Sequence, residues 1–238
     1  MVAAPDTAAA LNAELNEMTN RQFETPEFRD LLSLPFTMAR ARLYTINMAH
    51  YVSNRRDCWG YVQGSAPLDI KRLVWEHESD ELVNDPRAGM DHYALAAKEA
   101  QVLGLTREDL ANTEPVPGAL ACYYAWIHVA MTRSWLEAVT SSSMLERRNS
   151  GAVVKGGGLS FRIKEKLIKE LGIAEDRLIN QSVHVEADLE HASLLDVVIE
   201  RYVKTAEDRE AILRGARASF AIDRAYRGAL AQAMARLD

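Results

Sequence analysis

Cysteine is scarce in this chain of 238 residues, which excludes a fold that depends on disulfides. Only Cys58 and Cys122 occur, and 48% of the residues are hydrophobic, so the chain can bury a sizeable core without covalent staples. The amino terminus carries acidic residues where a secretory signal would have a basic start and an apolar run. These features favour a reducing, cytoplasmic compartment.

Basic clusters and long apolar runs are missing as well. The net charge is −6 and the lysines and arginines are scattered, whereas binding to a phosphate backbone needs them gathered on one surface. No uninterrupted apolar stretch is long enough to cross a bilayer. The composition therefore argues against nucleic acid and membranes as partners, and it leaves a small molecule as the expected ligand.

Proline is absent from the second half of the chain, and no long run alternates between apolar and polar residues. All seven prolines lie at or before Pro117, at positions that suit first helical turns or breaks. Apolar residues recur instead at spacings of three and four, as in segments 41–52, 68–82 and 91–105. The pattern predicts an all-α protein.

The carboxyl-terminal half predicts a simple order of helices. It has one long helix over 119–148, a Gly-rich break over 151–158, a helix that Gly172 ends, a helix around 184–191 and a terminal helix over 209–237. No internal repeat or linker interrupts the chain, so we expect one helical bundle over residues 1–238. A homodimer would suit such a bundle, although no exposed stripe singles out an interface.

Two imidazoles and one carboxylate share a stripe in the segment HVEADLEH. His184, Asp188 and His191 are spaced by four and three residues, and because each helical residue turns by about 100°, their side chains fall on one face. The stripe continues at helical spacing with Leu195 and Val198, which favour burial. The segment therefore predicts a polar trio that faces the core, which is half of a site for two metal ions.

Three further residues begin or end apolar stripes elsewhere. The stripe of Ile70 and Val74 runs into Glu81, and His92 opens the next helix. Glu146 shares a face of the predicted long helix with buried-type residues. These three residues are the expected partners of the trio.

Several neighbours compete with these residues or could support them. The competing acids are Glu78 and Asp85 for Glu81, and Glu137 for Glu146. His77 and His128 share the faces of Glu81 and Glu146, so each could orient a ligand by hydrogen bonding. Arg147 and Arg148 are expected on a solvated face, and His50 is read as an ordinary, partly buried histidine.

The complete set joins three imidazoles to three carboxylates. Its members are Glu81, His92, Glu146, His184, Asp188 and His191, of which Glu81, Glu146 and Asp188 are also assigned to catalysis. Such ligands without thiolate suit iron or manganese, and three carboxylates offset most of the charge of two divalent ions. The set therefore predicts a pair of ions.

Segments 78–105, 141–149 and 163–192 resemble the heme-oxygenase-like diiron oxidases and oxygenases. In that family a Glu and a His come from early helices, a Glu from a middle helix and an HxxxDxxH triplet from a late helix. The resemblance covers roughly residues 30–230, and the triplet is its specific part. The chain lacks the paired ExxH motifs of ferritin-like proteins, which disfavours that bundle.

The resemblance implies a heme-oxygenase-like bundle of about seven helices that binds two iron ions, cycling between Fe(II) and Fe(III). O2 would be the co-substrate and an external reductant would supply electrons, while manganese fits the same ligands. Expected reactions are N-oxygenation or oxidative C–C cleavage of a small amino-acid-like, amine or carboxylate substrate in natural-product or cofactor biosynthesis. Lys155, Arg162, Thr132 and Ser142 are the candidate substrate contacts.

Two other classes of function remain open at this point. The segment GALACYYAW is similar to TenA-type thiamine-degrading hydrolases, which share the fold without a metal, and Cys122 near a helix start would then be the nucleophile. That alternative leaves His184, Asp188 and His191 unexplained. The other class is a non-catalytic helical protein that binds or stores metal.

Overall fold

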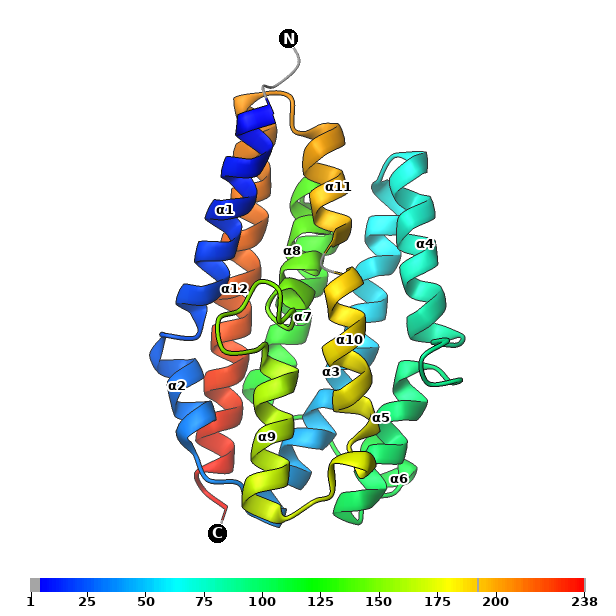
Figure 1. Ribbon diagram of the computed structural model, residues 1–238, viewed down its shortest axis with the longest axis vertical. Helices are drawn as coiled ribbons and strands as arrows, with labels where there is room; N and C mark the ends of the chain where they lie inside the picture. Colours follow the sequence, from blue (N-terminus) through cyan, green and yellow to red (C-terminus); the bar gives the residue numbers. More distant parts are fainter. Residues whose placement is uncertain (1–4, 192, 238) are drawn as a thin grey trace.

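The computed structural model is a bundle of α-helices (Figure 1). We describe residues 5–191 and 193–237, and the side chains of that part except those of residues 5–7 and 188–191. This part holds twelve α-helices, two short 3-10 helices and no strand. The α-helices are α1 Pro5–Gln22, α2 Pro26–Ser33, α3 Met38–Ser65, α4 Leu68–Leu82, α5 His92–Ala100, α6 Arg107–Asn112, α7 Pro117–Thr132, α8 Trp135–Arg147, α9 Leu159–Leu171, α10 Ile179–His191, α11 Ser193–Tyr202 and α12 Ala206–Met234. The 3-10 helices are η1 Gln101–Leu103 and η2 Glu175–Arg177. The predicted all-α class is confirmed, whereas seven helices was too low a number.

The expected long helix over 119–148 is wrong, because the chain breaks between α7 and α8. Arg133 has an extended backbone, and the Ser134 hydroxyl accepts a hydrogen bond from the backbone N–H of Glu137. The Glu137 carboxylate in turn accepts from the N–H of Ser134 at 3.3 Å. This capping box starts a new helix, so residues before and after Arg133 no longer share a face.

The helix ends that local signals predicted are present. Gly172 ends α9 in the left-handed conformation at φ 66°, which glycine adopts without the steric cost of a Cβ atom. Pro26 and Pro117 stand in the first turns of α2 and α7. Leu195 and Val198 are fully buried as expected, and they lie in α11.

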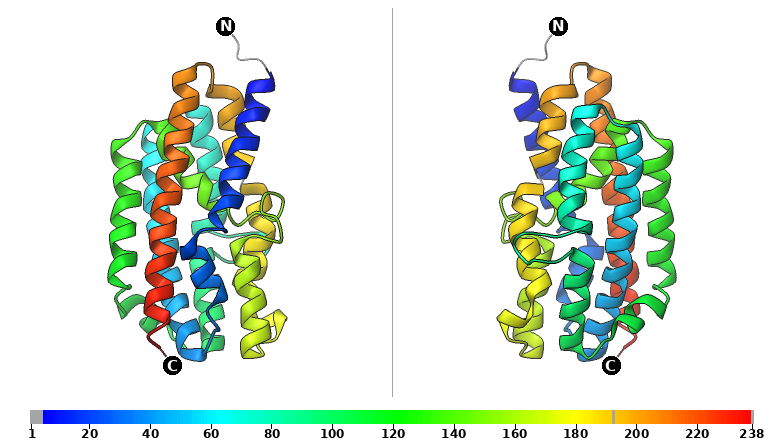
Figure 2. Two further views of the ribbon diagram at one scale, coloured as in Figure 1. Left: turned by 90° about the vertical axis from the view of Figure 1, so that its left-hand side faces the viewer. Right: turned by 90° about the vertical axis from the view of Figure 1, so that its right-hand side faces the viewer.

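The helices run along the long axis of the molecule in stacked pairs. In Figure 1, α4 stands above α5 and α11 stands above α10. Figure 2 shows α3 beside α4 in the right-hand view, and the two helices are in contact. Helix α10 packs against α5, α8 and α9, and α4 packs against α5. The lower end of α4, the start of α5 and the middle of α10 therefore meet at half height.

Two large apolar clusters form the core, and α3 contributes to both. Tyr51 belongs to one cluster and Trp59 to the other. Between them on the same helix lie the buried polar residues Asn54 and Arg55 and the largely buried Arg56. Arg56 lies where α3 meets the lower end of α4, since it contacts Glu81. None of the helices within the described ranges is long and apolar enough to span a membrane.

Candidate metal centre

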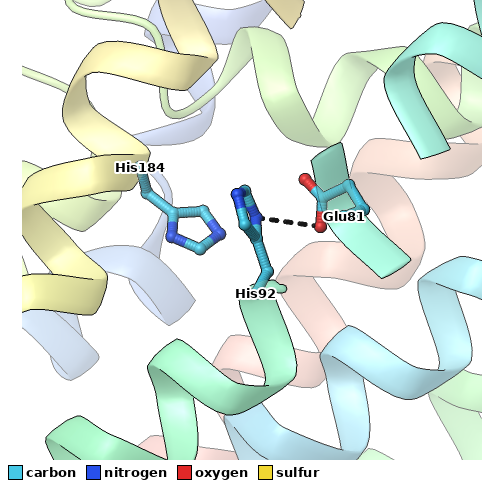
Figure 3. A group of neighbouring side chains, drawn as sticks. All are labelled: Glu81, His92 and His184. Atoms are coloured by element: carbon cyan, nitrogen blue, oxygen red, sulfur yellow. Dashed lines mark ion pairs between the residues drawn. The ribbon is translucent and has the colours of Figure 1, made fainter. Parts of the chain in front are cut away.

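The turn between α4 and α5 brings Glu81 and His92 together. Asp91 is the N-cap of α5 and its carboxylate accepts from the N–H of Ala94 at 2.8 Å, which makes His92 the first residue of the helix. The Glu81 carboxylate and the His92 ring are almost completely buried, and Glu81 Oε2 lies 3.0 Å from His92 Nδ1. Figure 3 shows this ion pair facing the ring of His184.

His92 has a carboxylate at each ring nitrogen. Its Nε2 lies 2.8 Å from Oδ2 of Asp85, a fully buried acid in the turn. Asp85 is itself fixed, since its Oδ1 accepts from the N–H of Arg87 at 2.8 Å and its N–H donates to the carbonyl of Met90. This arrangement leaves Nδ1 on the side of Glu81, as in metal sites where a carboxylate orients a ligating histidine.

His184 completes a group of three possible ligands. One ligand atom from each of Glu81, His92 and His184 lies within 4.8 Å of the others, and the two rings are 4.6 Å apart between centroids. Nδ1 of His184 lies 2.9 Å from the carbonyl oxygen of Asn180, so that Nδ1 donates a proton there and Nε2 is the nitrogen available to an ion. These three predicted ligands are therefore brought together by three helices.

Glu146 lies in an adjoining group on α8. Its Oε1 is 3.0 Å from Nε2 of His77 and accepts from the indole N–H of Trp59 at 3.2 Å. The other ring nitrogen of His77 is 2.9 Å from Oε1 of Glu78. His77 thus contacts Glu146 rather than Glu81, whose face it was predicted to share, and its ring packs at a tilt against Trp59 with the ring centroids 4.9 Å apart.

Arg56 on α3 connects the two groups and was missed in the sequence. Its Nη1 lies 3.0 Å from Glu81 Oε2 and 2.9 Å from Glu78 Oε1. Two arginines in the middle of a largely buried helix, Arg55 and Arg56, were the available signal, because a charged side chain at such a position needs a partner. Trp59, one turn further along α3, was missed as well.

Opposite charges shift the pKa values across the site. Burial disfavours charge on His77 and His92, but Glu146 raises the pKa of His77 to about 10, and Glu81 with Asp85 raises that of His92 to about 9. Burial likewise opposes ionisation of Glu81, yet Arg56 and His92 hold its pKa well below the usual range. Burial, together with the charge on His92, lowers the pKa of His184.

Most of the predicted ligand set fits a metal centre. Iron and manganese prefer imidazole and carboxylate donors, and the set contains two imidazoles that can be neutral, several carboxylates and no thiolate. Asp188 and His191 have their backbone in α10, but their side chains lie outside the described residues. Of the competitors, Asp85 supports His92, Glu78 pairs with Arg56, and Glu137 caps α8 and pairs with Arg214.

The predicted substrate contacts do not gather around these ligands. Thr132 is exposed at the end of α7 and bonds the carbonyl of His128, which is also exposed. The shared face of His128 and Glu146 is therefore wrong, because it assumed an unbroken helix. Lys155 is exposed, and Arg162 donates to the carbonyls of Lys155 and Gly157, so its guanidinium holds the loop before α9. Ser142 alone of the four is buried, one turn before Glu146 on α8.

A crevice between α4 and α11 lies beside His77, which contacts Glu146. It encloses about 300 Å³ and is lined by Leu73, Glu76, His77, Asp80, Ser193, Leu194 and Val197. His77 forms its floor, since that side chain is buried and contacts Glu146 on the other side. This opening was not predictable from the sequence, because its walls come from helices more than 100 residues apart.

Two other sequence expectations concern residues outside the centre. Cys122 is buried, and burial raises the pKa of its thiol to about 11, which is the opposite of the lowering that an activated nucleophile needs. It is also the sixth residue of α7, beyond the first turn where a helix dipole acts. Nε2 of His50 lies 2.8 Å from the carbonyl oxygen of Thr113, in keeping with an ordinary histidine.

Solved structures with the same architecture show the class of fold. A domain of unknown function with a heme oxygenase-like fold from Shewanella denitrificans has a TM-score of 0.74 at 16% identity, over 94% of this chain and 92% of its own. A CADD-like protein of unknown function from Nostoc punctiforme has a TM-score of 0.68 at 17% identity, over 96% of both chains. A TenA homologue from P. horikoshii has a TM-score of 0.60 at 17% identity, over 92% of this chain and 98% of its own. The fold is heme-oxygenase-like, as the resemblance implied.

A family model for iron-containing redox enzymes matches residues 42–224. The match spans most of the chain, so the protein belongs to this family of iron-containing redox enzymes, and the resemblance to heme-oxygenase-like oxidases is confirmed at that level. No curated protein matches the chain.

Proposed function

We propose that residues 1–238 form one domain that binds two iron ions and uses O2 to oxidise a small substrate with an amine or carboxylate group. The convergence of Glu81, His92 and His184 in one group, whose first two members are buried, carries this proposal. Glu146 would be the ligand from α8, and Asp188 and His191 would add donors from α10. When bound, iron supplies the redox chemistry of O2 reduction, and an external reductant returns it to the ferrous state.

The protein's own groups fix and shield such a centre. Asp85 and the carbonyl of Asn180 hold the two histidine rings in one orientation each, because each occupies the ring nitrogen that does not face the group. His77 and Trp59 hold one oxygen of Glu146. The apolar clusters above and below exclude bulk water from the ligands, which strengthens every charge interaction between them.

The crevice beside His77 is the proposed route for the substrate. Its walls combine the apolar side chains of Leu73, Leu194 and Val197 with the acids Glu76 and Asp80. Acidic walls attract a cationic ammonium group and repel a free carboxylate. Among the substrate types that the resemblance implies, this lining favours a short apolar amine or an amino acid whose amine enters first.

Anaerobic titration with Fe²⁺ followed by exposure to O2 tests the proposal. We expect about two iron ions per chain and O2 consumption that amines or amino acids accelerate. His184→Ala should lose most iron binding and O2 consumption, whereas His128→Ala, which changes an exposed histidine on α7, should keep both. Tight iron binding without any substrate-dependent O2 consumption would identify a storage protein instead, and an active metal-free enzyme that Cys122→Ser inactivates would identify a hydrolase.

A further inference from the structure

Arg56 sits where the two halves of the proposed metal centre meet. Its Nη1 contacts Oε2 of Glu81, the same oxygen that lies 3.0 Å from His92 Nδ1. It also contacts Glu78, which belongs with His77 and Glu146 to the second half. One cation therefore holds a carboxylate from each half.

The charge on Arg56 is permanent. Burial disfavours it, but Glu81, Glu78 and Glu146 together outweigh burial and raise the pKa of the guanidinium. The carboxylates of Glu81 and Glu146 would offset the charge of an ion bound by Glu81, His92 and His184. The guanidinium already offsets the charge of Glu78. This positive charge would repel a second divalent ion held beside Glu146, because the side chains of this site are only about a tenth exposed and water screens the charges weakly.

The structure also offers the guanidinium another position. A groove of about 460 Å³ between α3 and α7 is lined by Arg56, Asp57, Gly60, Tyr61 and Ile127. Arg56 lies between this groove and the centre, and Asp57 offers a carboxylate at the groove's wall. Gly60, one turn beyond Arg56, leaves the space open, since a Cβ built there meets no atom within 4 Å.

We infer that Arg56 is a displaceable occupant of the second half of the centre. With one ion bound at Glu81, His92 and His184, the guanidinium stays on Glu78 and Glu81. Admission of the second ion requires it to swing outward into the groove between α3 and α7. This inference rests on the proposed function and specifies how its centre fills: the two ions bind in sequence and with unequal affinity.

Binding of Mn²⁺ to the purified full-length chain tests the inference without turnover. Equilibrium dialysis with metal analysis and electron paramagnetic resonance of the bound ion would measure both sites. We expect the native chain to bind one Mn²⁺ tightly and a second at least tenfold more weakly. Arg56→Gln should tighten the second site at least tenfold, and by more than it changes the first, because it removes the competing charge.

Two further variants separate charge from position. Arg56→Lys keeps a cation and should keep the weak second site, whereas Arg72→Gln removes an exposed charge on α4 and should change neither site. Gly60→Leu fills the groove at an exposed helical position and should weaken the second site further, by trapping Arg56 inside. Thermal melting followed by circular dichroism verifies that each variant is folded, and the Gly60 variant provides a test that leaves every charge of the centre in place.

The outcomes distinguish the inference from the proposed function. Equal affinities at two sites in the native chain, or a second site unchanged by both Arg56→Gln and Gly60→Leu, would overturn the role of Arg56 while leaving a two-ion centre intact. Absence of tight Mn²⁺ binding, or binding that His184→Ala does not weaken, would overturn the metal centre itself.

Discussion

His92 is held by hydrogen-bonding partners at both nitrogens of its ring. Each ring nitrogen faces a carboxylate, one from α4 and one from the turn that follows it. Asp85 contacts no other predicted ligand among the described side chains, and its own charge is offset by Arg87. Its effect on a bound ion is therefore exerted through the orientation of the His92 ring.

Asp85→Asn should lower the affinity for Fe²⁺ or Mn²⁺ by about 10- to 100-fold, which is typical when a partner that orients a ligand is removed. Competition against a chromophoric chelator under anaerobic conditions measures the change. Asp109→Asn is the matched control, because Asp109 also accepts a backbone N–H but does so in the exposed capping box of α6. Equal affinities in the two variants would show that Asp85 serves the turn alone.

Among the single residues of the site, those that recur at helical spacing were predictable from the sequence. Those that reach the site only through the packing of another helix were missed. Glu81, His92 and His184 were found because each ends, begins or continues a stripe of apolar residues. Arg56 approaches them from another helix, so no spacing connects it to them. The pairing of His128 with Glu146 failed because a single extended residue, Arg133, shifts the helical phase.

Among the helices, the starting residue of α8 is determined by its own first turn. Ser134 and Glu137 close the capping box that separates α8 from α7, and this start sets which residues of α8 point toward the centre. The Glu146 carboxylate is positioned three turns further along.

Ser134→Ala should cost about 1 kcal/mol of unfolding free energy, since it removes the acceptor for a backbone N–H in the first turn. Urea denaturation followed by circular dichroism measures the loss. Ser160→Ala provides the comparison, because Ser160 lies in the first turn of α9 but Gly158 is the N-cap there. A loss no larger in Ser134→Ala than in Ser160→Ala would contradict the role of the cap.

Helix α10, which carries His184, is tied to α5 by Glu99. The buried Glu99 carboxylate accepts from the backbone N–H of Gln181 at 3.0 Å and from its side-chain amide at 3.3 Å. Burial raises the pKa of Glu99 to about 7, although these hydrogen bonds oppose the rise. The folded protein therefore holds a proton on Glu99 at pH values where the unfolded chain has lost it.

The native chain should lose stability as the pH rises from about 4.5 to about 7 relative to Glu99→Gln. In that window the folded state binds more protons than the unfolded state, so the contribution is complete below the unfolded pKa and is lost as the pH passes the folded one. The loss is on the order of 3 kcal/mol. Urea denaturation across this range measures it, and parallel pH profiles for both proteins would refute the assignment.

The elements themselves were largely predictable, because their signals are local. Gly172, Pro26 and Pro117 mark ends and starts whose geometry depends on a few neighbouring residues.

At the scale of the whole molecule, a buried network of charged residues joins three helices, and the sequence did not predict it. Asp223 on α12 lies 2.9 Å from Arg148 Nε and 3.0 Å from Arg227 Nε, and it accepts from Gln22 at 2.7 Å. All four residues are buried. Arg147 and Arg148 were expected on a solvated face, and burial of both corrects that interpretation. The run of two arginines carries no local sign that an acid 75 residues later will pair with one of them.

Asp223→Ala should cost about 3 to 5 kcal/mol of unfolding free energy, because it leaves two buried guanidinium groups without their shared carboxylate. Chemical denaturation measures the difference. Glu210→Ala removes a carboxylate from an exposed pair with Arg217 and should cost no more than about 1 kcal/mol. Similar losses in both variants would mean that the guanidinium groups find other partners.

The proposed ligands lie far apart along the chain, so the ribosome synthesises them at different times. Glu81 and His92 leave the ribosome first, and His184 follows 103 residues after Glu81 (184 − 81). At about 5 to 20 residues per second, synthesis of the intervening segment takes roughly 5 to 20 seconds. During that time the early ligands and Arg56 have each other as partners, and the guanidinium keeps the acids of α4 neutralised until the last helices arrive. The proposed iron centre can therefore be completed only after the last of these helices has been synthesised.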